Sequence, residues 1–259
     1  MQTRQVFSLE DARRALKPKA SAQAMQERLK YYVRTRRLLP VTRGVYAAIP
    51  LGLEAGRFHP DPLLVAATVR PDAVFAFYSA LSLLGAARVD WNIVTVVTSR
   101  RRRALDVSGV RIDFLSVPPA LARLHKQGVG LRSVDRQGRA LRVTGPERTL
   151  VEGFREPGRM GGVSELVEAA ASFPVLDVDL VERFLRAFDE KVLWAAAGWF
   201  LERHRESFSV PDTYLARLER HRPHARVYLA RREGRGWLAP RWNLMLPERV
   251  MRPGEPDER

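Results

Sequence analysis

The sequence contains no cysteine, which excludes disulfide bonds and thiolate metal sites. It also lacks long apolar runs: the longest, VLWAAAGWFL at positions 192–201, has ten residues and is too short to span a bilayer. No apolar stretch of signal-peptide length occurs near the start. We therefore expect a cytoplasmic protein with no membrane partner, in which 192–201 forms a helix buried on nearly every side.

Lysine is scarce, because only five of the 44 basic residues are lysines. With 29 acidic residues, the net charge is +15, which favours polyanionic partners, nucleic acid before anionic membranes. An arginine-rich composition can also come from a GC-rich genome, so the distribution of the charge matters. Residues 1–50 hold 11 basic and 3 acidic residues, a net charge of +8. This concentration predicts a nucleic-acid contact near the start of the chain.

The segment 1–50 has the pattern of a small DNA-binding domain. Ser8, with Asp11 three residues later, predicts the start of one helix, and Ser21 predicts the start of a second that runs to about residue 37. LLPVTRGVYAAIP then predicts a β-hairpin that turns at Arg43-Gly44. This order is typical of a winged helix-turn-helix, although residues 1–6 are too few for the extra helix of a full three-helix core. The alternative is a solvated helix face followed by an ordinary hairpin.

The second helix carries apolar residues on one face and polar residues on the other. Gln23 and Gln26 are predicted to contact bases, because an amide can pair with an adenine edge. The basic side chains of this segment, including Arg36, are predicted to neutralise phosphates. The predicted DNA-binding residues are Ser21, Gln23, Gln26, Arg28, Lys30, Arg34, Arg37, Thr42 and Arg43. A run of arginines is either a second phosphate contact or a solvated loop between hairpin strands: Arg100, Arg101, Arg102 and Arg103.

Beyond a Pro- and Gly-containing connector, the pattern predicts helices at 62–69 and 73–87, strands in WNIVTVVTS and GVRIDFLSV, and a strand pair turning at Gln137-Gly138. Thr144 and Glu147 predict a capping box, followed by a run of helices and two late strands. Strands followed by helices predict an α+β fold. The predicted domains are 1–50, a winged-helix DNA-binding domain; 51–60, a linker; 61–250, a larger α+β domain; and 251–259, a disordered tail.

Catalytic patterns are weak throughout the chain. Ser79 lacks a Gly-x-Ser-x-Gly surround, GRMGG lacks the Lys-Ser/Thr of a P-loop, and His204 and His221 are expected at the surface. We therefore expect no catalytic residue, no metal site and no cofactor. Two alternatives remain: a nuclease-like enzyme in the C-terminal domain, with Asp113 as the only candidate carboxylate, and a protein-interaction module without salt-dependent DNA affinity.

Five stretches, in this order and spacing, carry a family resemblance: LKYYVRTRRLLPVTRGVYAAIP, FYSALSLLGA, VTGPERTLVEGFREPGRMGGVSELVEAA, AAGWFLE and WNLMLP. From about residue 7 to 247 the chain resembles the AbiEi-type antitoxins of type IV toxin–antitoxin systems. The resemblance implies an N-terminal winged helix that binds operator inverted repeats as two copies and represses its own operon. It also implies a C-terminal domain that counteracts a nucleotidyltransferase toxin without a stable complex.

Two short segments match the family pattern and two positions depart from it. RGVY, residues 43–46, matches the wing turn, and PERTL, residues 146–150, matches the start of a central helix. Glu152 replaces an Asp that often follows TLV, and Leu84 replaces a His that often precedes Gly85. Both departures bear on any activity that depends on those side chains and affect the DNA-binding segment less.

Overall fold

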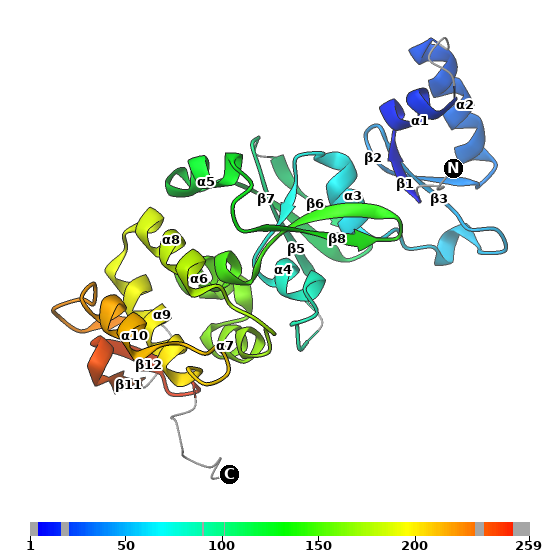
Figure 1. Ribbon diagram of the computed structural model, residues 1–259. Coiled ribbons are helices and arrows are strands. Elements are labelled where there is room, and N and C mark those ends of the chain that lie inside the picture. Colours follow the sequence, from blue (N-terminus) through cyan, green and yellow to red (C-terminus); the bar gives the residue numbers. More distant parts are fainter. Residues whose placement is uncertain (1–4, 17–20, 90, 101, 231–235, 251–259) are drawn as a thin grey trace. The chain divides into compact units, whose positions relative to one another are not determined.

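The computed structural model describes residues 5–16, 21–89, 91–100, 102–230 and 236–250 (Figure 1). The chain divides into two compact units. The first unit comprises Met1–Phe75, Trp91–Ser116 and Ser133–Val143, and the second comprises Ala76–Asp90, Val117–Arg132 and Thr144–Arg259. These units do not coincide with the predicted domains, because residues 1–50 group with strands that come later in the chain.

The start of the first unit is a three-stranded antiparallel sheet with two helices. Its elements are β1 (Val6–Ser8), α1 (Leu9–Leu16), α2 (Ala22–Arg34), β2 (Leu38–Thr42) and β3 (Val45–Ala48), and the strand order is β1-β3-β2. Ala12, Met25 and Leu29 form a small core between these elements. The two helices and the hairpin are as predicted, except that α2 ends at Arg34. The sequence analysis missed β1, whose three residues are too few to show an alternating pattern.

Side-chain caps fix where both helices begin. The Asp11 amide donates to Ser8 Oγ at 3.0 Å, while the Ser8 amide donates to Asp11 Oδ2 at 2.9 Å. Ser21 Oγ accepts a hydrogen bond of 3.1 Å from the Ala24 amide. Each cap satisfies N–H groups that have no partner within the helix, so the two predicted helix starts are confirmed.

A six-stranded mixed sheet has the order β6-β7-β5-β4-β9-β8. The β5–β7 and β4–β9 pairs are parallel, and the β4–β5 and β6–β7 pairs are antiparallel. In the first unit, helix α3 (Pro62–Val69) contacts β1, β3, β5 and β7, so the small N-terminal sheet and the large sheet share one covering helix. The strands are β4 (Val74–Phe75), β5 (Ile93–Thr98), β6 (Arg102–Val107), β7 (Val110–Ser116), β8 (Leu131–Arg136) and β9 (Arg139–Thr144).

One prediction in this region is wrong, and one of two alternatives left open holds only in part. The predicted helix at 73–87 is a two-residue central strand, β4, followed by a short helix, α4 (Tyr78–Leu83). Central strands are apolar on both faces, so the run resembled a buried helix. The arginine run is also not only a loop, because Arg102 and Arg103 begin β6, which forms a hairpin with β7. Its turn, Ser108-Gly109, has φ values of +55° and +81°.

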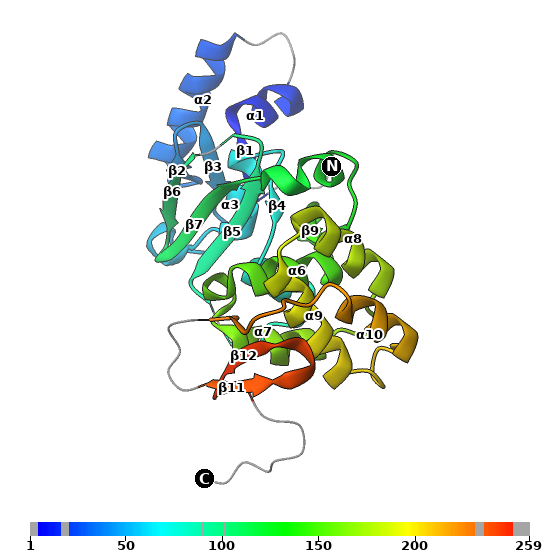
Figure 2. The ribbon, with the colours of Figure 1, turned by 90° about the vertical axis from the view of Figure 1, so that its left-hand side faces the viewer.

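The second unit is mainly helical. Helix α9 (Lys191–Arg203) contacts α6 and α10 (Figure 2), and its residues 193–201 are all buried, as predicted from its apolar run. The other helices are α5 (Ala122–Lys126), α6 (Pro146–Arg155), α7 (Val163–Ala171), α8 (Val178–Phe188) and α10 (Asp212–Glu219). A small sheet of order β10-β12-β11 consists of β10 (Val227–Tyr228), β11 (Gly236–Ala239) and β12 (Leu244–Pro247). The described residues also form four 3-10 turns: η1 (Ala55–Arg57), η2 (Pro119–Leu121), η3 (Pro157–Met160) and η4 (Pro240–Trp242).

The predicted capping box at α6 is wrong. Gly145 is the N-cap, and Thr144 Oγ1 instead lies 2.7 Å from Thr149 Oγ1. Glu147 is buried, and its Oε1 accepts a hydrogen bond of 3.1 Å from the Asp177 amide at the start of α8. The carboxylate therefore stabilises the neighbouring helix rather than its own. Pro146 in the first turn of α6 is as predicted.

Two predictions concern the membrane and the tail. In the part of the chain that the structure describes, no helix has both the length and the apolar character of a membrane span. The predicted disordered tail, 251–259, lies outside the described residues. The expected α+β character is confirmed, since helices and three sheets occur together in the part of the chain that the structure describes.

Candidate nucleic-acid interface

Helix α2 has one buried and one exposed face. Met25 and Leu29 point into the small core and are 2% and 3% exposed. The side chains on the other face are exposed, as predicted: Gln23, Gln26, Arg28, Lys30 and Arg34. Ser21, just before the helix, is also exposed while its Oγ caps the first turn. The structure thus brings amides and cations together on a single solvent-facing surface.

One carboxylate and one aromatic ring modify the charge on this surface. Lys30 Nζ lies 2.7 Å from Glu27 Oε1, and the hydrogen bond and charge of Glu27 raise the pKa of Lys30. Arg34 lies over the ring of Tyr31, 5.9 Å from its centroid. Tyr31 is 52% exposed, whereas Tyr32 is half-buried. Arg34 is therefore held by a cation–π contact and has no carboxylate partner among the described residues.

The chain leaves the helix before Arg36 and Arg37. Thr35 Oγ1 donates to the Tyr31 carbonyl at 3.0 Å, and Arg36 adopts a φ of +54°. The Arg37 carbonyl accepts a hydrogen bond of 3.0 Å from the Ile49 amide. Arg37 is exposed beside the hairpin and not on the helix, contrary to the predicted helix end.

The hairpin turn presents Arg43 to solvent. Gly44 has a φ of +75°, which suits glycine at a tight turn, and its carbonyl accepts a hydrogen bond of 2.9 Å from the Leu9 amide. The turn is thereby tied to the start of α1. Thr42 is half-buried on the strand beside the turn, and Arg43 is exposed.

The arginine run at residues 100–103 lies partly against this hairpin. Arg102 Nη2 donates to Thr42 Oγ1 at 3.3 Å, and burial, together with the charge of Arg70, lowers the pKa of Arg102. Arg100 and Arg103 are exposed, and Arg101 lies outside the described residues. The Arg102–Thr42 bond connects strand β6 to the hairpin within the first unit.

The residues considered for metal binding or catalysis do not converge. Among the described residues, no group of three or more His, Asp or Glu side chains is placed to hold a metal ion. Asp113 Oδ1 accepts a hydrogen bond of 2.8 Å from Arg111 Nε. The surface location expected for His204 and His221 is wrong in part: both are half-buried, His204 against Phe200 and His221 stacked on Trp194 with ring centroids 4.0 Å apart.

A buried charged cluster in the second unit was not predicted. Arg148 is 0% exposed and makes two hydrogen bonds to Glu152, of 3.1 Å through Nε and 3.0 Å through Nη2. Arg148 Nη1 also lies 3.1 Å from His125 Nδ1, so a neutral His125 carries its proton on Nε2. The i, i+4 spacing of Arg148 and Glu152 was a signal for this pair, but their burial is not readable from the spacing. Glu152, the residue that departs from the family pattern, therefore keeps a buried ion pair.

No protein-family model and no curated protein sequence matches this chain. Among solved structures, it is similar to the RV2827C protein from Mycobacterium tuberculosis, with a TM-score of 0.63 and 20% sequence identity. The similarity covers 95% of this chain and 87% of that chain. At this identity the likeness concerns the fold alone, so the chain shares an α+β fold with that protein over nearly its whole length.

Proposed function

We propose that this protein is a DNA-binding transcriptional repressor whose helix α2 enters the major groove of operator DNA. One observation carries the proposal: α2 buries Met25 and Leu29 and exposes amides and cations, next to a hairpin with Arg43 at its turn. The order β1-α1-α2-β2-β3, with strands arranged β1-β3-β2, also supports a winged helix-turn-helix that lacks a preceding helix.

Each side chain has a role that follows from its position. Gln23 and Gln26 lie in the first half of α2, where recognition helices contact base edges, and their amides suit adenine. The hydroxyl groups of Ser21 and Thr42 lie at the margins of the surface. The cations that contact phosphates are Arg28, Lys30, Arg34, Arg37 and Arg43, with Arg100, Arg102 and Arg103 as a second contact beside the hairpin.

The resemblance to AbiEi-type antitoxins extends the proposal. The protein acts as an antitoxin that counteracts a nucleotidyltransferase toxin without a stable complex, and two copies bind the inverted repeats of one operator. Coexpression with a nucleotidyltransferase toxin, taken from the neighbouring reading frame where that frame encodes one, tests this part. Restored growth without copurification is expected, and continued growth arrest would contradict it.

The replacement of Arg34 and Arg43 by Ala tests DNA binding. We expect Arg34→Ala/Arg43→Ala to weaken operator binding at least about tenfold, because two phosphate contacts are lost. A gel-shift titration with DNA from upstream of the gene measures this effect, and circular dichroism verifies the fold.

The matched control is Arg123→Ala/Arg220→Ala, which removes the same charge from two exposed sites in the second unit. It should bind DNA nearly as the wild type does. Equal affinities for the two double variants would show that only net charge matters, and the proposed interface would then be wrong.

A nuclease-like enzyme remains the alternative function, but no specific observation favours it. Its candidate carboxylate, Asp113, is paired with Arg111 and belongs to the first unit rather than the C-terminal part. Cleavage of DNA or RNA by the purified chain with added Mg²⁺ or Mn²⁺ would support this alternative.

A further inference from the structure

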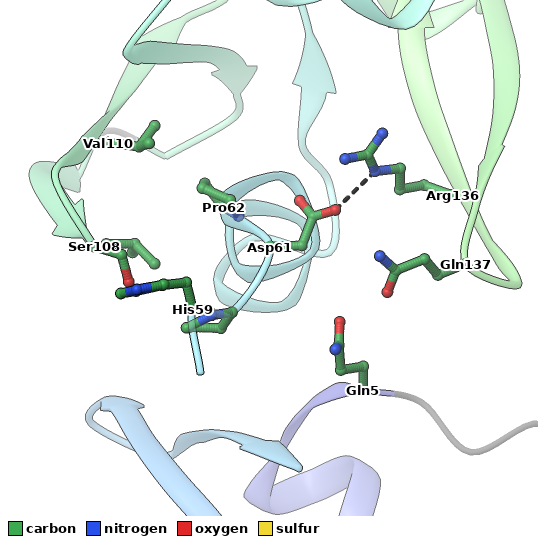
Figure 3. A pocket seen from close by; sticks show the side chains of 10 residues that line it. Gln5, His59, Asp61, Pro62, Ser108, Val110, Arg136 and Gln137 are labelled. Atoms are coloured by element: carbon green, nitrogen blue, oxygen red, sulfur yellow. Dashed lines mark hydrogen bonds and ion pairs between the residues drawn. The ribbon is translucent and has the colours of Figure 1, made fainter. Parts of the chain in front are cut away.

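A cavity of about 300 Å³ lies in the first unit, at the start of α3 (Figure 3). Residues 59–62 form one side of it, and the β6–β7 and β8–β9 turns contribute Ser108 and Gln137. Gln5, the residue before β1, lines its lower side in the view of Figure 3. This volume is near the lower end of the range of small-molecule sites, roughly 300–1,000 Å³.

The polar groups around the cavity are only partly used by the protein itself. Asp61 Oδ1 caps α3 through the Leu63 amide at 2.8 Å, and its Oδ2 accepts a hydrogen bond of 2.7 Å from Arg136 Nε. The Asp61 carboxylate is therefore occupied and holds the guanidinium in place. The Nη1 and Nη2 groups of Arg136 have no partner among the described residues and can donate to an anion in the fork geometry that suits carboxylates and phosphates.

Gln5 supplies a second, unsatisfied group. Its side-chain oxygen, Oε1, is buried and has no hydrogen-bond partner within the described part of the chain. A buried carbonyl without a donor costs free energy, and a ligand N–H group would recover it once the Gln5 side chain turns its oxygen toward the cavity. In Figure 3 the Gln5 side chain points toward that of Gln137, so the two amides face the same space.

The remaining walls are apolar or aromatic. Val107, Val110, Pro60 and Pro62 supply carbon surface, and the His59 ring lies beside Ser108. A ligand is thus met by a cation on one side, an amide acceptor on another, and apolar surface between them. This combination suits an organic molecule better than an inorganic ion.

We propose that this cavity binds a small organic anion that carries both a phosphate or carboxylate group for Arg136 and an N–H donor for Gln5. The ligand acts as an effector of the DNA-binding segment. The Gln5 carbonyl accepts a hydrogen bond of 2.7 Å from the Ala48 amide, and β1 and β3 pair directly after it. Occupancy at Gln5 therefore acts on the strands that carry the hairpin. The effector role rests on the proposed function, whereas ligand binding does not.

Binding is measured first, on the full chain without DNA. Saturation-transfer NMR with a mixture of the four ribonucleoside monophosphates, and separately with a mixture of amino acids, distinguishes phosphate esters from carboxylates. Titration calorimetry then gives the affinity of the best binder and of inorganic phosphate. We expect one organic anion to bind at least about tenfold more tightly than inorganic phosphate, because only the organic anion also satisfies Gln5 and the apolar walls.

Two variants locate the site. Arg136→Gln should weaken binding about tenfold or more through loss of a charge-assisted contact, and Gln5→Leu should weaken it while keeping side-chain volume. Arg142→Gln, an exposed arginine on β9 away from the cavity lining, is the matched control and should bind as the wild type does. The absence of any organic binder, or equal affinity of Arg136→Gln and Arg142→Gln, would overturn the site.

The effector role is tested separately with operator DNA. The ligand should change operator affinity at least about threefold in the wild type and not in Gln5→Leu. Arg34→Ala/Arg43→Ala should still bind the ligand, so failure of the DNA-binding proposal leaves the cavity result intact. Ligand binding without any change in operator affinity would overturn the effector role.

Discussion

Asp72 shows how a single carboxylate fixes the end of a strand. Its Oδ2 accepts hydrogen bonds from the Ser99 amide at 2.7 Å, from Ser99 Oγ at 2.6 Å and from Thr98 Oγ1 at 2.8 Å. Burial raises the pKa of Asp72, but these hydrogen bonds together outweigh burial and lower the pKa to about 2. The end of β5, where the arginine run begins, is thus held by an ionised carboxylate.

Replacement of Asp72 by Asn should make the free energy of unfolding depend less on pH in the acid range. Because the pKa is lower in the folded protein than in the unfolded chain, ionised Asp72 stabilises the fold above roughly pH 4, and this contribution is lost as pH falls toward 2. We expect Asp72→Asn to lower the free energy of unfolding by about 1–2 kcal/mol at pH 7.

Urea unfolding from pH 7 down to pH 2 measures the effect. The difference in free energy of unfolding between the wild type and Asp72→Asn should become smaller below about pH 4. Glu206→Gln, at an exposed site, serves as the control and should follow the wild type at every pH. A difference in free energy of unfolding that stayed constant with pH would contradict the role given to Asp72.

The Arg148–Glu152 pair shows that the spacing of two residues in the sequence does not reveal whether they are buried. Their four-residue separation on one helix predicts a contact, yet a surface pair and a buried pair have the same spacing. In the structure both side chains are almost fully buried, and burial raises the pKa of Glu152 while Arg148 opposes this shift. Removal of one partner from such a pair costs far more than it would at the surface.

At the scale of elements, helix α9 and the 3-10 turn η4 pack unusually closely. Trp242 is 0% exposed, and its Nε1 donates to Glu202 Oε2 at 2.6 Å. A Cβ atom at Gly198 would lie 2.2 Å from Cζ3 of the Trp242 ring. Gly198 is therefore required for contact between these elements, although glycine is a poor helix former.

We expect Gly198→Ala to destabilise the protein by about 1–3 kcal/mol, because the overlap with a rigid buried ring outweighs the gain of roughly 1 kcal/mol in helix propensity. Thermal unfolding of the variant beside Gly158→Ala measures this. A Cβ at Gly158 meets nothing within 4 Å, so that variant should unfold near the wild-type temperature. Higher stability of Gly198→Ala than of the wild type would refute this account.

The sequence predicted the elements whose periodicity is long and regular. Helix α2, helix α9 and strand β5 are at their expected places because each has enough residues to show an apolar pattern. Strands β1 and β4, with three and two residues, show no pattern of their own and depend on partners that are distant in the sequence. Pairing partners are not encoded locally, so these strands could not be predicted.

The candidate sites also differ in how far they could be predicted from the sequence. The exposed face of α2 follows from local spacing, and its residues are exposed as predicted. The Arg102–Thr42 bond and the cavity at Gln5 each join residues at least 50 positions apart, through the pairing and packing of strands. Only the fold brings such residues together.

For the whole molecule, the positive charge has a measurable consequence. Each phosphate neutralised by a cation releases counterions, so DNA affinity should fall steeply as salt rises. We expect Arg100→Gln/Arg103→Gln to reduce the slope of log affinity against log salt by about 1 to 2, if the run is a second phosphate contact.

Fluorescence anisotropy at five salt concentrations gives this slope. Arg123→Gln/Arg220→Gln, with the same change in net charge, should leave the slope unchanged. Identical slopes for the two double variants would exclude the arginine run from the DNA contact and restrict the interface to α2 and the hairpin.

The covering helix α3 and the Arg102–Thr42 bond have a practical consequence for anyone who divides the chain. A fragment that stops at residue 50 would lose both. The side of β1 and β3 that α3 covers would be exposed to solvent, and Thr42 would lose its hydrogen bond from Arg102. Exposed strands of this kind invite aggregation. Expression of residues 1–50 alone would therefore give an aggregation-prone fragment. A fragment that extends beyond β9, which pairs with β4 in the large sheet and belongs to the first unit, would be the sounder choice.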